Sequence, residues 1–150
     1  VPIFLMAFRW GLKGGLLAGF LLGLLQVAVG QAYIIHPLQG FLDYFAAFTV
    51  VGISGIFAAR IKQAYERGEK KKAGSYIVTG IFLGSLLRFL CHFATGIIYF
   101  SSSNIGGFDI VLTSAVYNGT YMVPSFIICS VVVVSLYASA SRVLLKSVTR

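Results

Sequence analysis

Residues 110–140 read IVLTSAVYNGTYMVPSFIICSVVVVSLYASA and contain no Asp, Glu, Lys or Arg. A helix needs about 20 mainly apolar residues to cross the hydrocarbon of a bilayer, so this stretch predicts a transmembrane helix that is long for one crossing. Pro124 lies inside the stretch, and a proline within a helix favours a kink or a tilt. A break into two short helices is the alternative.

Three more apolar runs precede this stretch, at about Gly11–Val29, Leu38–Ala59 and Tyr76–Phe100. The first residues, Val1–Phe8, are apolar but too few to cross a bilayer. We interpret them as the end of a helix that begins before the first residue given. The sequence therefore predicts an all-α, polytopic membrane helix bundle with four complete transmembrane helices and an N-terminal helix stub, in a single integral-membrane domain covering residues 1–150.

The composition excludes a water-soluble globule. The chain is 58% hydrophobic and 11% charged with a mean hydropathy of +0.90, whereas soluble domains carry roughly 25% charged residues. A net charge of +8 does not indicate nucleic acid, because the basic residues lie between long apolar runs and not on a solvated face. Cys91 and Cys129 fall inside apolar stretches and suggest no disulfide framework, metal site or cofactor.

The basic residues predict the orientation of the helices, since cytoplasmic loops are enriched in Lys and Arg. All of the 12 except Arg88 fall on one side of the predicted membrane: Arg9, Lys13, Arg60, Lys62, Arg67, Lys70, Lys71, Lys72, Arg142, Lys146 and Arg150. The connections 31–39 and 101–109 on the other side contain none. We expect the basic side, with the C-terminus, to face the cytoplasm. Residues 70–72 are a topology signal or, alternatively, a contact for anionic lipid or a partner.

Glycines recur every four residues in the first span, at Gly11, Gly15, Gly19 and Gly23, and the third span carries Gly80 and Gly84. Such spacing lets two helix backbones approach closely in lipid. We expect these stripes to pack within the bundle. The alternative is a contact face for a separate membrane subunit.

Polar residues that interrupt the spans are the candidates for function, because an ionisable group in hydrocarbon is costly unless it faces a partner or a cavity. Asp43 lies about five residues, or roughly 7 Å, below the outer end of its span, and His92 lies roughly 12 Å below the outer end of the next. Asn118 has a similar depth, and Arg88 is one turn deeper than His92. Alternatively, Asp43 lies at headgroup level or pairs with Arg88, and His92 makes only an interhelical hydrogen bond.

Aromatic side chains gather at the same level: Tyr33, Tyr44, Tyr99, Phe100, Tyr117 and Tyr121. Tyrosines near a membrane surface are usually interfacial belt residues. A carboxylate in a pocket of low dielectric with ring faces nearby suits an organic cation, since both stabilise positive charge. His92 and Asn118 would add hydrogen bonds to a heteroaromatic ligand, and Gly96 would leave room for a flat ring. No phosphate-binding loop, nucleophile beside a base or metal-ligand cluster indicates an enzyme.

Four segments resemble the thiamine-specific substrate-binding subunit (S component) of energy-coupling factor transporters. They are GQAYII (residues 30–35), FLDY (41–44), LRFLCHFATGII (87–98) and AVYNG (115–119). They follow the family's order and approximate spacing and span most of the chain. Family members have six helices, so the resemblance implies that this chain holds the end of the second helix and then the third to the sixth.

The resemblance implies a thiamine pocket on the outer side. Asp43 matches an acidic residue, usually Glu, that faces the cationic thiazolium, and His92 matches a histidine whose ring stacks on the ligand. Asn118 matches an amide that reads the aminopyrimidine. Three further positions match residues near the ligand, namely Tyr33, Tyr44 and Gly96.

Two positions depart from the family's pattern. Phe100 stands where a stacking Trp is usual and can still stack. Thr113 stands where a pocket Tyr is expected, and Tyr117 or Tyr121 would have to supply the missing hydroxyl. The ligand is thiamine, one of its phosphates or a pyrimidine precursor.

The resemblance also implies high-affinity capture, followed by transport that depends on a transmembrane coupling subunit and two cytoplasmic ATPases. A different hypothesis is a small proton-coupled exporter of aromatic cations, in which one membrane carboxylate alternates between protons and substrate. That class favours an acid near mid-bilayer and little charge bias, unlike this sequence. A structural membrane subunit without a ligand is the third hypothesis.

Overall fold

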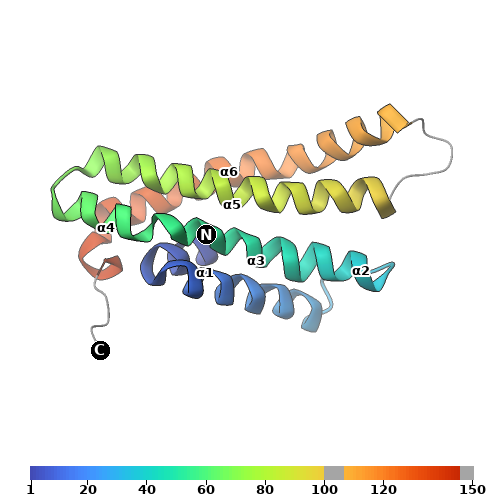
Figure 1. Ribbon diagram of the computed structural model, residues 1–150, viewed down its shortest axis with the longest axis horizontal. Helices are drawn as coiled ribbons and strands as arrows, with labels where there is room; N and C mark the ends of the chain where they lie inside the picture. The colour runs from blue at the N-terminus through green and yellow to red at the C-terminus, as the bar shows by residue number, and fades with distance from the viewer. Residues whose placement is uncertain (100–106, 146–150) are drawn as a thin grey trace.

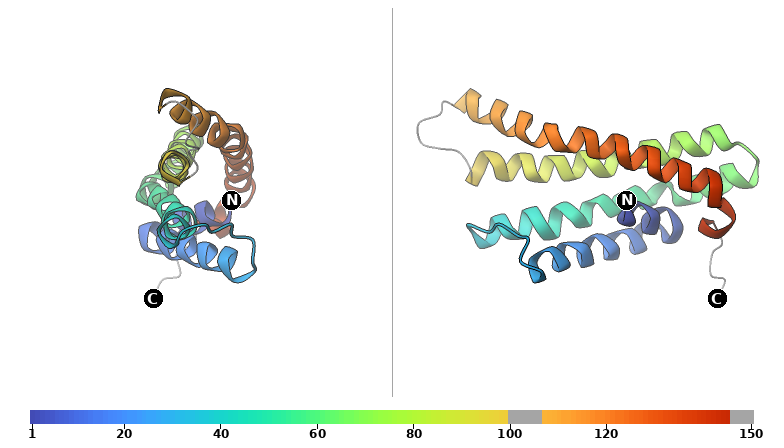
Figure 2. Two further views of the ribbon diagram at one scale, coloured as in Figure 1. Left: turned by 90° about the vertical axis from the view of Figure 1, so that its right-hand side faces the viewer. Right: turned by 180° about the vertical axis from the view of Figure 1, so that it is seen from behind.

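The computed structural model describes residues 1–99 and 107–145. In that part, four helical segments are long and apolar enough to cross a membrane: α1 (Pro2–Ala28), a composite helix over Pro37–Glu66, α5 (Lys70–Tyr99) and α6 (Gly107–Leu144). Together with the family shown below, this confirms the predicted class, an all-α bundle of four membrane helices. Seen end-on, they form a curved layer in chain order (Figure 2).

The helix α1 consists of two segments that meet at Gly11. Gly11 has φ 71° and ψ −162°, a conformation that only glycine adopts readily. The chain reverses its direction there, so the first segment lies against the rest of the bundle (Figure 2). Its Phe8 ring packs edge-on against Tyr137 of α6, with ring centroids 6.4 Å apart. The predicted division between the N-terminal stub and the first span therefore falls at Gly11.

The second span is a continuous rod whose hydrogen-bonding pattern changes along its length. It comprises α2 (Pro37–Gly40), the π-helix η1 (Phe41–Ala46), α3 (Ala47–Val51), the 3₁₀-helix η2 (Gly52–Phe57) and α4 (Ala58–Glu66). The predicted end at Ala59 was wrong, and most of the expected loop 60–72 is helical. The reason is that α4 is amphipathic: Ile61 and Ala64 are buried while its charged side chains are exposed.

Glycines bring α1 and this rod into backbone contact. A Cβ added at Gly15 would lie 2.6 Å from the carbonyl oxygen of Gly52, and one added at Gly19 would lie 2.2 Å from that of Phe48. At Gly80 and Gly84 of α5 the space is filled by the rings of Phe8 and Phe4. These glycine stripes therefore pack inside the bundle.

The bundle has an apolar half and a polar half. The buried hydrophobic cluster joins the first segment of α1 to the basic ends of the other helices, through residues such as Phe8, Ile61, Ile77, Val133 and Tyr137. The turn between α4 and α5 and the end of α6 lie at this end, whereas the α1–α2 connection lies at the other (Figure 1).

The helix α6 does not break into two short helices at Pro124. Pro124 keeps helical dihedral angles, and the residue with non-helical angles inside the helix is Ala140, at φ −122° and ψ 28°. Proline costs a helix one hydrogen bond, and α6 is long enough to continue on both sides of it. The alternative of a break into two short helices at Pro124 is therefore wrong, the kink or tilt stays a prediction, and the irregular residue lies near the C-terminal end of the helix.

We expect Gly19→Ala to destabilise the protein, because the new methyl group would collide with backbone that cannot move aside. The expected cost is about 1–3 kcal/mol of unfolding free energy, measured as a lower midpoint of thermal unfolding in detergent. Gly119→Ala in α6 is the matched control, since a Cβ there meets nothing within 4 Å. Equal midpoints for the two variants would contradict the packing described.

Candidate functional site

A cavity of about 540 Å³ opens in the polar half, between the α1–α2 connection, the π-helix, α5 and α6. Pockets of this size hold small organic molecules. Every predicted site residue within the described part of the chain lines the cavity; these are Tyr33, Asp43, Tyr44, His92, Gly96, Tyr117, Asn118 and Tyr121. Phe100 lies outside the described residues.

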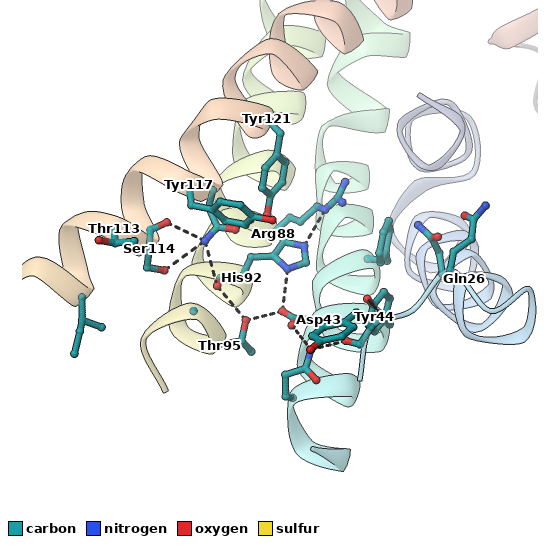
Figure 3. A pocket seen from close by; sticks show the side chains of 17 residues that line it. Gln26, Asp43, Tyr44, Arg88, His92, Thr95, Thr113, Ser114, Tyr117 and Tyr121 are labelled. Carbon is teal, nitrogen blue, oxygen red and sulfur yellow. Dashed lines mark hydrogen bonds and ion pairs between the residues drawn. The ribbon is translucent and has the colours of Figure 1, made fainter. Parts of the chain in front are cut away.

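Asp43 is the central acceptor on the cavity wall. The side chain of Asp43 is 12% exposed, and its carboxylate accepts hydrogen bonds from Gln39 Nε2 at 2.6 Å, Thr95 Oγ1 at 2.6 Å and His92 Nδ1 at 2.9 Å. Figure 3 shows His92 and Thr95 of α5 pointing toward Asp43 of the π-helix. Hydrogen bonds to charged groups contribute about 1.5–3 kcal/mol each, which offsets the cost of a carboxylate inside the membrane.

Arg88 contacts Asp43 only through His92. Its Nε lies 3.3 Å from His92 Nε2, and its guanidinium lies over the ring of Phe48, with 4.3 Å from Cζ to the ring centroid. Because a guanidinium only donates, His92 Nε2 must accept, and the proton of the imidazole is then on Nδ1, where it is donated to Asp43. Asp43 therefore does not pair directly with Arg88, and His92 makes an interhelical hydrogen bond to Asp43. The carboxylate, the neutral imidazole and the guanidinium form one chain of contacts.

Polar contacts also join α5 to α6. Ser114 Oγ donates to the carbonyl of Phe93 at 3.0 Å, and Asn118 Nδ2 donates to the carbonyl of His92 at 3.4 Å. Within α6, Asn118 Nδ2 also donates to the carbonyl of Ser114 at 2.9 Å. Tyr121 donates to the amide oxygen of Asn118. A Cβ at Gly96 would lie 2.2 Å from Ser114 Oγ, so glycine is needed there for the two helices to approach.

Arg88, which the sequence analysis considered as a partner of Asp43, and Thr113, which stands at an expected pocket position, also line the cavity. Seven further cavity residues were not predicted: Gln26, Gln31, Gln39, Phe48, Thr95, Ile110 and Ser114. All seven are uncharged, and a neutral polar residue in a membrane helix can satisfy itself locally, so its position alone gives no signal. Gln39 and Asp43 are four residues apart, a spacing that places side chains on one helix face. That spacing is the one sequence signal that could have identified Gln39.

The π-helix positions Asp43 and Tyr44. Each turn of a π-helix contains more residues than an α-turn, and such segments are frequent at functional sites. The cavity wall thus combines one carboxylate with the rings of Tyr44, Tyr117 and Tyr121 and with the imidazole of His92. Such a wall can hold a flat organic cation, because the anion and the ring faces both attract positive charge.

Comparison with known proteins identifies the family. Residues 1–145 match the family model described as "Thiamine transporter protein (Thia_YuaJ)". The chain belongs to the thiamine transporter family. Members of the thiamine transporter family are transporters and not enzymes, and the prediction of a non-enzymatic membrane protein is confirmed.

Alignments with individual members of the thiamine transporter family extend over nearly the whole chain. Thiamine transporter ThiT of Bacillus subtilis (strain 168) is 45% identical over 144 residues, which are 96% of this chain and 75% of the relative. Thiamine transporter ThiT of Lacticaseibacillus paracasei is 33% identical over 136 residues, or 89% of this chain and 68% of the relative. The solved structure of ThiT from Listeria monocytogenes has a TM-score of 0.87 at 25% identity, covering 97% of this chain and 79% of that one.

The two histidines are expected to be opposite neutral tautomers. His92 Nδ1 donates to Asp43, whereas His36 Nδ1 accepts from the backbone N–H of Leu38 at 3.2 Å. Two-bond ¹⁵N–¹H correlation spectra of ¹⁵N-histidine-labelled protein near pH 8 should show His92 protonated at Nδ1 and His36 at Nε2. Spectra of His36→Gln assign the signals. Protonation of both nitrogens of His92 would contradict the chain from Asp43 to Arg88.

Proposed function

We propose that this chain captures thiamine with high affinity from the outer side of the cell membrane, and that Asp43 holds the positive thiazolium ring. The observation that carries the proposal is the Asp43 carboxylate on the wall of a cavity lined by tyrosine rings, in a chain of the thiamine transporter family. Within the described residues Asp43 accepts three hydrogen bonds. One lone pair of Oδ2 then remains for a ligand.

The other site residues complete the recognition of the ligand. The ring of His92, held edge-on to Tyr121 with centroids 6.3 Å apart, presents a face on which the thiazolium stacks. The Asn118 amide reads the aminopyrimidine when it exchanges its contact with Tyr121 for the ligand. Thr113 lines the cavity where the family resemblance implies a tyrosine, and Tyr117 and Tyr121 supply hydroxyl groups on the same helix.

The proposed orientation places the cavity outside and the C-terminus in the cytoplasm, with residues 1–150 forming a single integral-membrane domain. It is supported by the charge distribution: the turn between α4 and α5, with Lys70 beside it, lies at the end of the bundle opposite the α1–α2 connection (Figure 1). Basic residues are enriched on the cytoplasmic side of membrane proteins.

The proposed transport step is ATP-driven and needs an energy-coupling factor module, namely a transmembrane coupling subunit and two ATPases. The chain itself binds thiamine and releases it inward when the module reorients it. The support is the resemblance of residues 30–35, 41–44, 87–98 and 115–119 to substrate-binding subunits of such transporters.

Asp43→Asn is expected to weaken thiamine binding about 100-fold or more, because it leaves the cation in the pocket without its counter-charge. Isothermal titration calorimetry in detergent measures the dissociation constant. Asp109→Asn is the matched control, since Asp109 is exposed in the first turn of α6, and it should bind like the unmodified chain.

Asp43→Glu keeps the charge and should retain most of the affinity. Equal affinities for Asp43→Asn and Asp109→Asn would overturn the assigned role of Asp43. Titrations with thiamine monophosphate and with the free aminopyrimidine give their dissociation constants. Comparison with the value for thiamine shows which part of the ligand determines affinity.

Uptake into proteoliposomes is expected to require the complete module and ATP. Radiolabelled thiamine should accumulate when ATP is supplied to the ATPase side, and a pH gradient without ATP should produce no accumulation. Vesicles that contain the chain alone are the control. Thiamine movement driven by the pH gradient would instead favour the proton-coupled exporter.

A further inference from the structure

Gln39 is almost completely buried, at 1% exposure, and all of its amide groups are engaged. Oε1 accepts from the backbone N–H of Ile35 at 3.1 Å, and Nε2 donates to the carbonyl of Tyr33 at 3.3 Å and to Asp43 Oδ2 at 2.6 Å. These partners fix which end of the amide is oxygen, because Asp43 and the carbonyl only accept. One side chain thus contacts both the proposed ligand-binding carboxylate and the α1–α2 connection.

Side chains of the second span bind the backbone of the α1–α2 connection. In the described part of the chain, its backbone-to-backbone hydrogen bonds stop at Gln31 and resume where Gly40 donates to His36. Between them, Gln39 binds the backbone of Tyr33 and Ile35, and the hydroxyl of Tyr44 accepts from Tyr33 N–H at 2.7 Å. The π-helix and the residue just before it therefore hold this connection in place.

The same connection is a wall of the cavity, since Gln31 and Tyr33 line it together with Gln39 and Asp43. Movement of the connection would widen the cavity. Gln39 joins this wall to the carboxylate, because its one amide binds the backbone of Tyr33 and Ile35 and also Asp43 Oδ2.

We propose that Gln39 is a positioning residue for cation capture: its amide orients Asp43 toward the ligand and ties residues 33–35 to the same carboxylate. Release of the ligand from Asp43 is then coupled to movement of the α1–α2 connection away from the cavity. This inference rests on the proposed function for the identity of the ligand. The contact between Gln39 and the connection does not depend on the ligand.

The first test is Gln39→Leu, which removes all three hydrogen bonds at similar volume. Amide hydrogen exchange in residues 32–35 of the unliganded protein should accelerate about tenfold or more, as loss of a hydrogen bond predicts. The thiamine dissociation rate, measured by chasing radiolabelled ligand, should rise by a similar factor while the association rate changes less. Gln63→Leu is the matched control, because Gln63 is exposed on α4.

The second test, Gln39→Glu, detects the contact with Asp43 even where the leucine variant folds poorly. Two carboxylates at this distance cannot both ionise readily, so the pair shares one proton, and the arriving cation should expel it. Calorimetry in buffers of different ionisation enthalpy should show proton release on thiamine binding to this variant and none for the unmodified chain or for Gln63→Glu.

The outcomes separate the two proposals. Unchanged exchange in residues 32–35 of Gln39→Leu, or absence of proton release in Gln39→Glu that binds thiamine, would overturn the role of Gln39. If the unmodified chain binds no thiamine while Gln39→Leu accelerates exchange, the proposed ligand fails and the tie between Gln39 and the connection is supported.

Discussion

The structure depends on keeping one carboxylate inside a helix bundle in the membrane. Asp43 accepts from Gln39 on its own helix and from His92 and Thr95 on α5, all within 2.9 Å. An unpaired charge at this depth would cost several kcal/mol. The partners therefore have to be present before any ligand arrives, and they lock the π-helix, α5 and the α1–α2 connection into one arrangement.

That arrangement requires close helices, which glycines provide along the bundle. Where Gly15 faces Gly52, α1 and the second span meet backbone to backbone, and the rings of Phe4 and Phe8 fill the grooves at Gly84 and Gly80. The apolar half is thus closely packed and can hold the helices rigidly. The polar half can then leave a cavity of about 540 Å³ without losing the alignment of its walls.

The sequence predicted the membrane spans and the polar residues that interrupt them. It did not predict the π-helix or the end of the second span, which depend on local backbone geometry and packing. The spans followed from apolar runs, and Asp43, His92 and Asn118 were identified because they interrupt those runs. The π-helix at residues 41–46 could not be predicted, since nothing in FLDYFA distinguishes it from an α-helix. The helix continues to Glu66 because amphipathic packing of Ile61 and Ala64 persists beyond the apolar run. Thr95 and Gln39 were missed because their role exists only opposite Asp43.

The protonation states bear on how a cation would be exchanged. Arg88 carries a positive charge, His92 between it and Asp43 is neutral, and Asp43 is the only anion in the chain of contacts. A proton on Asp43 would occupy the one lone pair that Gln39, Thr95 and His92 leave free. A monovalent cation needs only the remaining lone pair and the ring faces around it. A proton and an organic cation therefore compete for the same lone pair, and the rings of Tyr44, Tyr117 and Tyr121 favour the organic cation, because their faces attract a bound cation but do not contact a proton on the carboxylate.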